Sequence, residues 1–389
     1  MKKIFSILLT AAVTLTAFSQ VKVPGYGSSL KTGYGPWICN VGETEVTILW
    51  TTKAPCVGWV EIAPDDGTNW YLCERPQFYE VELGRRPATD FHSVRVTGLQ
   101  KGTVYRYRIF GRELVDTSNP HSEVFGMVAN MRPERKVKTL DCSAAKCRFS
   151  MVNDLHFGDS QYAQMMEGMP KDNDFILLGG DVVSYCEHRD SILRHVVGPI
   201  KEIARNIPFA YVRGNHENRG EGYRWIPRIF PTNNGKLYYV FRQGPVAFLM
   251  LDCAEDKPDS DIEYCGTAQF DAFRAQELEW LKEAVKDPLF VSAPQKVAVL
   301  HIPLLDKKNV WYGQNWLIQN FTPILNEAGV KLMLSGHHHK YILQKPCDGF
   351  NFTTVVNNKF ERLDFEADSK SIHMKTYAPD GTLQHSIDL

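Results

Sequence analysis

Five short apolar runs of this chain each end in side chains that can bind a metal ion. The side chains are Asp154, His156, Asp181, Asn215, His301, His337 and His339. Imidazole, carboxylate and amide oxygen together suit zinc, iron or manganese better than magnesium alone. This set is larger than one ion requires, so we expect two ions, with the Asp181 carboxylate as their bridge. Two ions a few ångströms apart, about 3.5–4 Å, can clamp both oxygens of an in-line displacement.

The runs before these side chains are predicted to be buried strands. Residues 175–178 are entirely apolar and lead into Gly179, Gly180 and Asp181, which is typical of a parallel strand that stops at a tight turn. Similar strands are predicted at 149–153, 209–213, 297–300 and 332–335. Sheets of this kind bind ligands beyond the carboxyl ends of their strands. We therefore expect the five strand ends to gather into one site at a sheet edge.

In this order, the motifs resemble those of the calcineurin-like metallophosphoesterases. The matching segments are Asp154-x-His156, Gly180-Asp181, Gly214-Asn215-His216-Glu217, His301 and Gly336-His337-x-His339. The resemblance covers roughly the last two-thirds of the chain. It implies one metal ion on Asp154, His156, Asp181 and His339. It implies a second ion on Asp181, Asn215, His301 and His337.

His216 follows a ligand directly and is the expected catalytic side chain, a role that the resemblance also implies. We expect it to assist the leaving oxygen, with Glu217 orienting its ring. Hydroxide held between the two ions would attack phosphorus in line. The formal charges agree, because two metal ions outweigh two aspartates and a hydroxide, and a net positive site attracts a phosphoryl group.

The region before the motifs resembles the arrangement in purple acid phosphatases, but two positions depart from that subgroup. The subgroup has glycine where this chain has His156, and a metal-binding tyrosine where this chain has Ser184. Tyr185 falls one residue late. The broader family therefore fits better, and the colour of an iron–tyrosinate bond is not expected.

Length and composition indicate two globular domains, and the N-terminal segment indicates export. The chain has 389 residues, 43% of them hydrophobic, which favours two globular domains. Residues 1–19 resemble a signal peptide, with Lys2 and Lys3 before an apolar stretch and Ala17-Phe18-Ser19 as the cleavage site. An uncleaved anchor is the alternative; no cysteine follows the site, so lipid anchoring is not expected. After cleavage we expect a periplasmic or secreted protein without a membrane span.

The remaining chain divides by its hydrophobic period. Residues 20–136 alternate with period two and predict a β-sandwich, which resembles a fibronectin type III-like domain around 99–107. A linker is expected at 137–146, followed at 147–389 by an α/β domain of two packed sheets flanked by helices. Helices are predicted over 188–206 and 268–286. Strands after residue 341 are expected to complete the second sheet.

Nine cysteines leave at least one thiol unpaired in an exported protein. Cys253 could pair with Cys265, and Cys142 with Cys147. Buried reduced thiols are an equal alternative for each pair.

The sequence thus predicts an exported binuclear metal phosphoesterase that acts on a small molecule or a polymer, with phosphate monoesters ahead of diesters. One alternative is a phosphodiesterase for nucleotides, lipid head groups or cell-wall polymers. An alternative of another class is a surface binding module with an inactive metal domain. A net charge of −1 gives no basic field for nucleic acid. Residues that either contact substrate or have packing or loop roles are Tyr185, His188, Arg219, Arg224, Trp311, Tyr312 and Trp316; Asp252 is taken as structural, and His338 is expected to point away.

Overall fold

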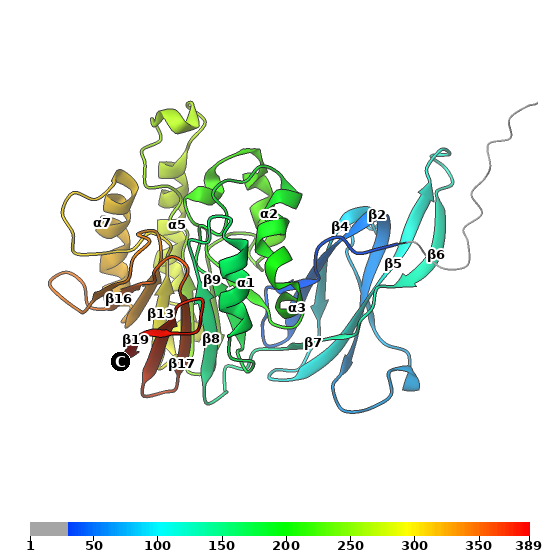
Figure 1. The fold of residues 1–389 in the computed structure, drawn as a ribbon, viewed down its shortest axis with the longest axis horizontal. Coiled ribbons are helices and arrows are strands. Elements are labelled where there is room, and N and C mark those ends of the chain that lie inside the picture. Colours follow the sequence, from blue (N-terminus) through cyan, green and yellow to red (C-terminus); the bar gives the residue numbers. More distant parts are fainter. Residues whose placement is uncertain (1–29) are drawn as a thin grey trace, which may run out of the picture.

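The computed structural model describes residues 30–389, so the expected signal peptide lies outside the described residues. A strand-rich N-terminal region is followed by an α/β region in which two sheets are flanked by helices (Figure 1). The predicted fold class is therefore confirmed. None of the helices in this described part is both long and apolar enough to cross a bilayer.

The strand-rich region is organised around the long strand β2 (Glu45–Pro64). Its other strands are β1 (Trp37–Cys39), β3 (Gln77–Tyr79), β4 (Thr89–Thr97), β5 (Val104–Asp116), β6 (Val124–Asn130) and β7 (Arg135–Lys138). The first half of β2 pairs with β4 and the second half with β5, with a register shift between Thr51 and Cys56. This change of partner lets the strands enclose one core that includes Trp50 and Tyr107. Because β7 pairs with β5 as far as Lys138, regular structure extends into the stretch expected to be a linker.

The α/β region contains two sheets that pack face to face. The described strands that continue the large sheet are β8 (Cys147–Val152), β9 (Phe175–Leu178), β10 (Phe209–Tyr211), β17 (Arg362–Ala367), β18 (Ile372–Tyr377) and β19 (Leu383–Asp388). The second sheet holds β11 (Tyr239–Gln243), β12 (Val246–Met250), β13 (Gln295–Val299), β14 (Leu332–Ser335), β15 (Ile342–Gln344) and β16 (Thr353–Val356). Phe149 and Phe175 stack at 4.8 Å between the sheets, and the edge of Phe248 meets both rings. The expectation that the tail completes the second sheet is wrong for β17–β19, which join β8.

Helices cover the outer face of each sheet (Figure 1). The helices over the large sheet are α1 (Asp159–Glu167), α2 (Arg189–Val196), α3 (Lys201–Ala204) and α4 (Ile226–Ile229); those over the second sheet are α5 (Phe270–Ala284), α6 (Pro288–Val291) and α7 (Tyr312–Glu327). Short 3₁₀ turns are η1 (Trp70–Leu72), η2 (Gly198–Ile200), η3 (His216–Asn218), η4 (Glu221–Trp225) and η5 (Ile262–Tyr264). The helix predicted over 188–206 is interrupted at η2, because Pro199 has no amide hydrogen for a continuous helix.

Strand β1 joins the two regions by backbone pairing. It runs antiparallel to β2 and parallel to β10, where Cys39 lies opposite Phe209. Trp37 is buried in the core beneath α1 and α2, and its indole N–H donates to the Ile229 carbonyl at 2.9 Å. The strand-rich region is thus part of the same continuous sheet as the strands that carry the candidate site.

All nine cysteines lie within the described residues and are free thiols. Neither candidate disulfide is formed. Cys253 is buried while Cys265 is exposed, and Cys147 is buried while Cys142 is half-buried.

Candidate metal centre

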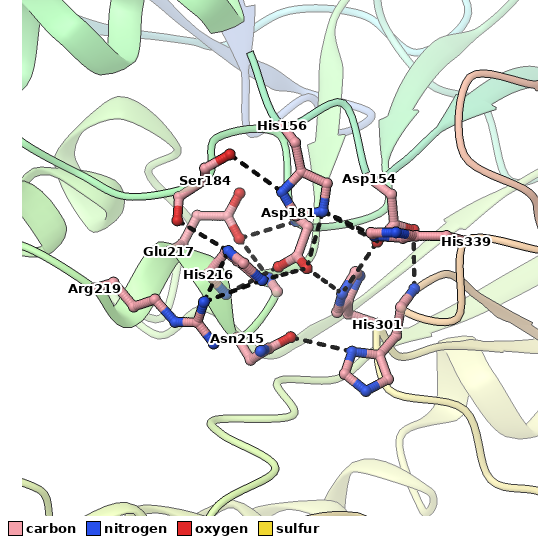
Figure 2. A network of polar contacts seen from close by, with 12 residues as sticks. Asp154, His156, Asp181, Ser184, Asn215, His216, Glu217, Arg219, His301 and His339 are labelled. Carbon is pink, nitrogen blue, oxygen red and sulfur yellow. Dashed lines mark hydrogen bonds and ion pairs between the residues drawn. The ribbon is translucent and has the colours of Figure 1, made fainter. Parts of the chain in front are cut away.

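The predicted ligand residues lie together where β8, β9, β10, β13 and β14 end, and Figure 2 labels all of them except His337. The site therefore uses the carboxyl edges of both sheets rather than of one. Within the described residues, three overlapping groups bring their ligand atoms to within 4.8 Å of one another: Asp154 with His156 and His339, His156 with Asp181 and His216, and Asp181 with His301 and His337. Asn215 joins them, because its Oδ1 lies 3.2 Å from His337 Nδ1.

Local backbone geometry explains why glycines precede Asp181 and Asn215. Gly180 has a φ of +89°, and a Cβ there would lie 2.6 Å from His301 Nδ1. A Cβ on Gly214 would lie 2.1 Å from Asp181 Oδ1. Only glycine lets the three strand ends approach so closely. Asp154 and Asp181 themselves have positive φ values of 51° and 52°, a left-handed conformation that costs roughly 1–2 kcal/mol for such residues.

Two buried atoms, His301 Nε2 and Asp154 Oδ1, point at the centre of the site. His301 Nδ1 lies 2.7 Å from the Gly179 carbonyl and donates its proton there, so the buried Nε2, 3.1 Å from Asp181 Oδ2, is the nitrogen that a metal ion could take. Asp154 Oδ2 accepts from the Asn153 amide at 2.6 Å and from the His337 backbone at 2.9 Å. Asp154 Oδ1 is buried and makes no hydrogen bond with the described residues. Buried lone pairs of this kind are costly unless a cation compensates them, so these residues fit a metal ion.

The electrostatics of the site also favour a cation. Burial lowers the pKa of His301, but the charges of Asp181 and Asp154 outweigh burial and raise it to about 10. A position where two carboxylates stabilise an imidazolium is one where they also stabilise a metal cation. The types of ligand atom and the negative charge of the site therefore both favour a bound metal cation.

His156 and His339 approach from the more open side. Their Nε2 atoms are 2.9 Å apart, and His339 Nε2 lies 3.2 Å from Asp154 Oδ1. His156 Nε2 is 3.7 Å from Asp181 Oδ2, and the His339 side chain is 44% exposed. Two imidazole nitrogens and two carboxylates therefore converge on one point that solvent can reach.

His216 lies beside this point with its ring held on several sides. Its backbone amide donates to Asp181 Oδ1 at 2.9 Å, and its Nδ1 donates to the Ser184 carbonyl at 2.9 Å. Arg219 Nη1 is almost equidistant from both ring nitrogens, at 3.1 and 3.2 Å, which places the guanidinium against the ring face. Burial lowers the pKa of His216 and outweighs the opposing charge of Asp181. The remaining nitrogen, Nε2, faces the carboxylate of Asp181 at 3.9 Å.

The prediction that Glu217 orients the His216 ring is wrong. The Glu217 carboxylate is buried and accepts backbone hydrogen bonds from Asp181 at 3.0 Å, Val182 at 2.7 Å and Gly214 at 2.9 Å. Burial and then the charge of Asp181 raise its pKa to about 7, while the amides oppose that rise. Glu217 holds together the two loops that carry Asp181 and Asn215, and the Ser184 carbonyl orients His216 instead.

Asp256 is a site residue that the sequence interpretation missed. Its Oδ2 lies 3.5 Å from His337 Nε2, so it can fix the ring while Nδ1 faces Asn215. Asp256, like Asp252, follows the apolar run of β12. An acidic residue after a predicted buried strand was the sequence signal that could have identified Asp256 as a site residue. Asp252 is structural, because its carboxylate binds Arg213 at 3.0 Å. His338 belongs to none of the three groups.

Two sheets, flanking helices and a converging histidine–aspartate set define a metal-dependent hydrolase. Residues 147–341 match the model of the calcineurin-like phosphoesterase family, so the chain belongs to that family and is a phosphoesterase. The chain is similar to purple acid phosphatase 23 of Arabidopsis thaliana, with 22% identity over 374 residues, 83% of this chain and 78% of the relative. Similarity to purple acid phosphatase 18 of the same plant is 23% over 321 residues, 78% of this chain and 64% of the relative.

Solved structures share the fold. The purple acid phosphatase PPD1 from yellow lupin (Lupinus luteus) seeds superposes with a TM-score of 0.62 at 15% identity, covering 92% of this chain and 74% of that one. PhoD superposes with a TM-score of 0.62 at 12% identity, covering 91% of each chain. Several of these similar proteins are purple acid phosphatases. In this chain, however, the residue beside His156 is a serine and not a tyrosine: Ser184 Oγ lies 3.4 Å from His156 Nδ1.

Proposed function

We propose that this protein is an exported phosphatase that hydrolyses phosphate monoesters at a binuclear metal centre. The observation that carries the proposal is the convergence of two buried atoms, Asp154 Oδ1 and His301 Nε2, which lie 3.8 Å apart, with His301 Nε2 3.1 Å from Asp181 Oδ2. When bound, two ions of iron, manganese or zinc would supply Lewis acidity and lower the pKa of water. The family implies a phosphoester as the substrate class.

The proposed ligands divide into two sets around Asp181. One ion would be held by Asp154, His156, Asp181 and His339, and the other by Asp181, Asn215, His301 and His337. The first and third groups of converging side chains support this division. Asn215 supplies a neutral oxygen, so the site keeps an excess of positive charge for the phosphoryl group.

His216 is the proposed catalytic residue. The Ser184 carbonyl holds Nδ1–H, so that Nε2 is directed at the reacting atoms, where it can carry a proton to the leaving oxygen. Arg219 lies against the ring and prevents its rotation away from this position. Glu217 acts only through the backbone that it binds.

The organisation outside the site is also part of the proposal. We assign residues 1–19 to a signal peptide, 20–136 to a fibronectin type III-like sandwich, 137–146 to a linker and 147–389 to the catalytic domain. Export to the periplasm or the medium follows from the signal peptide. The pairing of β1 with β10 supports a fixed position of the sandwich against the catalytic domain.

The experiment is a hydrolysis screen of phosphate mono- and diesters on protein reconstituted with iron, manganese or zinc, with elemental analysis. We expect Asp181→Asn to lose bound metal, because the bridging charge is removed. His216→Ala should retain metal but lose about 10²–10⁴-fold in kcat, the usual effect of a general acid. Asp306→Asn, an exposed carboxylate, is the control and should match the parent. Parent-like activity and metal content in both site variants would contradict the proposal.

A further inference from the structure

A continuous chain of ion pairs runs from His216 to His337 along one side of the metal centre. Arg219, which lies against His216, pairs with Glu263 at 2.8 Å. Glu263 also pairs with Lys257 at 3.0 Å, and Lys257 lies 3.5 Å from Asp256. Asp256 in turn contacts His337 at 3.5 Å. We call these four residues, Arg219, Glu263, Lys257 and Asp256, the paired wall.

The paired wall and its surroundings have no net positive charge. Its two cations face Glu263 and Asp256, and Lys257 is also 3.7 Å from the buried Glu255. Two cations against three carboxylates do not attract a second anionic group. A polyphosphorylated substrate would therefore gain nothing on this side, and an uncharged alcohol suits it better.

A large aromatic side chain, Trp311, lies next to the paired wall. Trp311 directly precedes α7 and is 58% exposed, with Lys257 Nζ 6.0 Å from its ring centre. The backbone two residues later is fixed to the wall, because the Gly313 amide donates to the Asp256 carbonyl at 2.7 Å. Residue 311 follows the loop that leaves the carboxyl end of β13, where His301 lies. The indole is thus held at the same edge of the sheet as the metal centre, and much of its surface is open.

We propose that Trp311 forms the subsite for the alcohol part of the substrate, and that this alcohol carries an aromatic ring. An exposed indole next to uncharged or charge-paired surface binds a flat ring by stacking and by burying apolar area. The substrate class would then be phosphate esters of aryl-bearing alcohols, nucleosides included, rather than esters of small aliphatic or polyphosphorylated alcohols. This inference rests on the proposed function, since it takes the metal centre as the phosphate site.

The test measures binding, which does not require turnover. The full chain, supplied with Mn²⁺ or Zn²⁺, is titrated calorimetrically with 2-phenylethylphosphonate, 2-cyclohexylethylphosphonate and propylphosphonate, which share the anionic group. We expect Trp311→Ala to weaken 2-phenylethylphosphonate about fivefold to tenfold and to change propylphosphonate less than twofold. Trp311→Phe should restore most of the affinity. Tyr312→Ala is the matched control, because this exposed neighbour binds Asp271 at 2.9 Å instead of the paired wall.

Equal affinities of parent and Trp311→Ala for the phenyl ligand would overturn the inference. An equal loss for phenyl and propyl ligands would also overturn it, because that pattern marks a structural role. If the cyclohexyl ligand loses as much as the phenyl ligand, the subsite is apolar but does not select aromatic rings, and the stated class is wrong. Failure of the proposed function appears separately, as a parent protein that hydrolyses none of the esters in the screen.

Discussion

Replacing Glu217 by glutamine tests which of two roles this residue has. It could bind the backbone of the two ligand loops, called here the clamp, or it could orient the His216 ring. In the native site Glu217 Oε2 accepts from the amides of Asp181 and Gly214, and Oε1 accepts from Val182 and, at 3.4 Å, from Val183. Glutamine must present an NH₂ group to one of these pairs of donors. Each hydrogen bond to a charged group contributes about 1.5–3 kcal/mol, so losing two costs about 3–6 kcal/mol. Relief of the repulsion between Glu217 and Asp181 offsets part of this cost, and we expect a loss of about 3 kcal/mol.

The assay is urea unfolding of the metal-stripped protein, followed by titration with Zn²⁺ or Mn²⁺ against a chromogenic chelator. We expect Glu217→Gln to unfold at lower urea concentration and to bind metal about tenfold to a hundredfold more weakly, because the loops of Asp181 and Asn215 loosen. Glu221→Gln is the control, since that side chain is 89% exposed and pairs with Arg224 at 3.2 Å, away from the metal centre's ligands. Unchanged stability and metal binding, together with a shifted pH profile of kcat, would refute the clamp and restore the orienting role.

Two further predictions concern other buried groups. Burial lowers the pKa of His92 to about 4, whereas in the unfolded chain it is about 6.5. The unfolded state therefore binds more protons between these values, and lowering the pH from 7 to 4 should remove about 3 kcal/mol of stability, a loss absent in His92→Gln. Identical pH dependence of urea midpoints in both proteins would contradict this. Asp256→Asn should weaken metal binding about tenfold in the chelator assay, since His337 loses its charged partner, with Asp306→Asn as control. Unaltered affinity would exclude a positioning role for Asp256.

The ligands could be predicted because each combines two signals that are readable in one chain. An apolar run identifies a buried strand, and a carboxylate, amide or imidazole just after that run marks its functional end; a glycine precedes this side chain at Asp181, Asn215 and His337. The convergence of Asp181, Asn215 and His301 follows from those signals, since parallel strands share one edge. The sequence did not predict that these strands belong to two different sheets, because a hydrophobic pattern shows which strands are buried and does not specify which strands pair.

Side-chain direction and long-range pairing were the parts that sequence could not supply. Glu217 is adjacent to His216, but the 3₁₀ turn η3 directs its carboxylate back to the amides of Gly214 and Asp181. Adjacency in a tight turn says little about contact. The pairing of Cys39 with Phe209 joins residues 170 positions apart, and a three-residue apolar strand carries no information about such a partner.

The arrangement of the site requires the surrounding fold to hold strained residues in place. Asp154, His156, Asp181, His337 and His339 all have positive φ values, between 44° and 73°. At roughly 1–2 kcal/mol each, this strain approaches the net stability of a whole domain. It persists because the strands before these residues are anchored in cores on both faces, and because Glu217 binds the loops between them. The ligands are therefore preorganised by the protein and not gathered by the ions, so removal of metal should leave the fold intact.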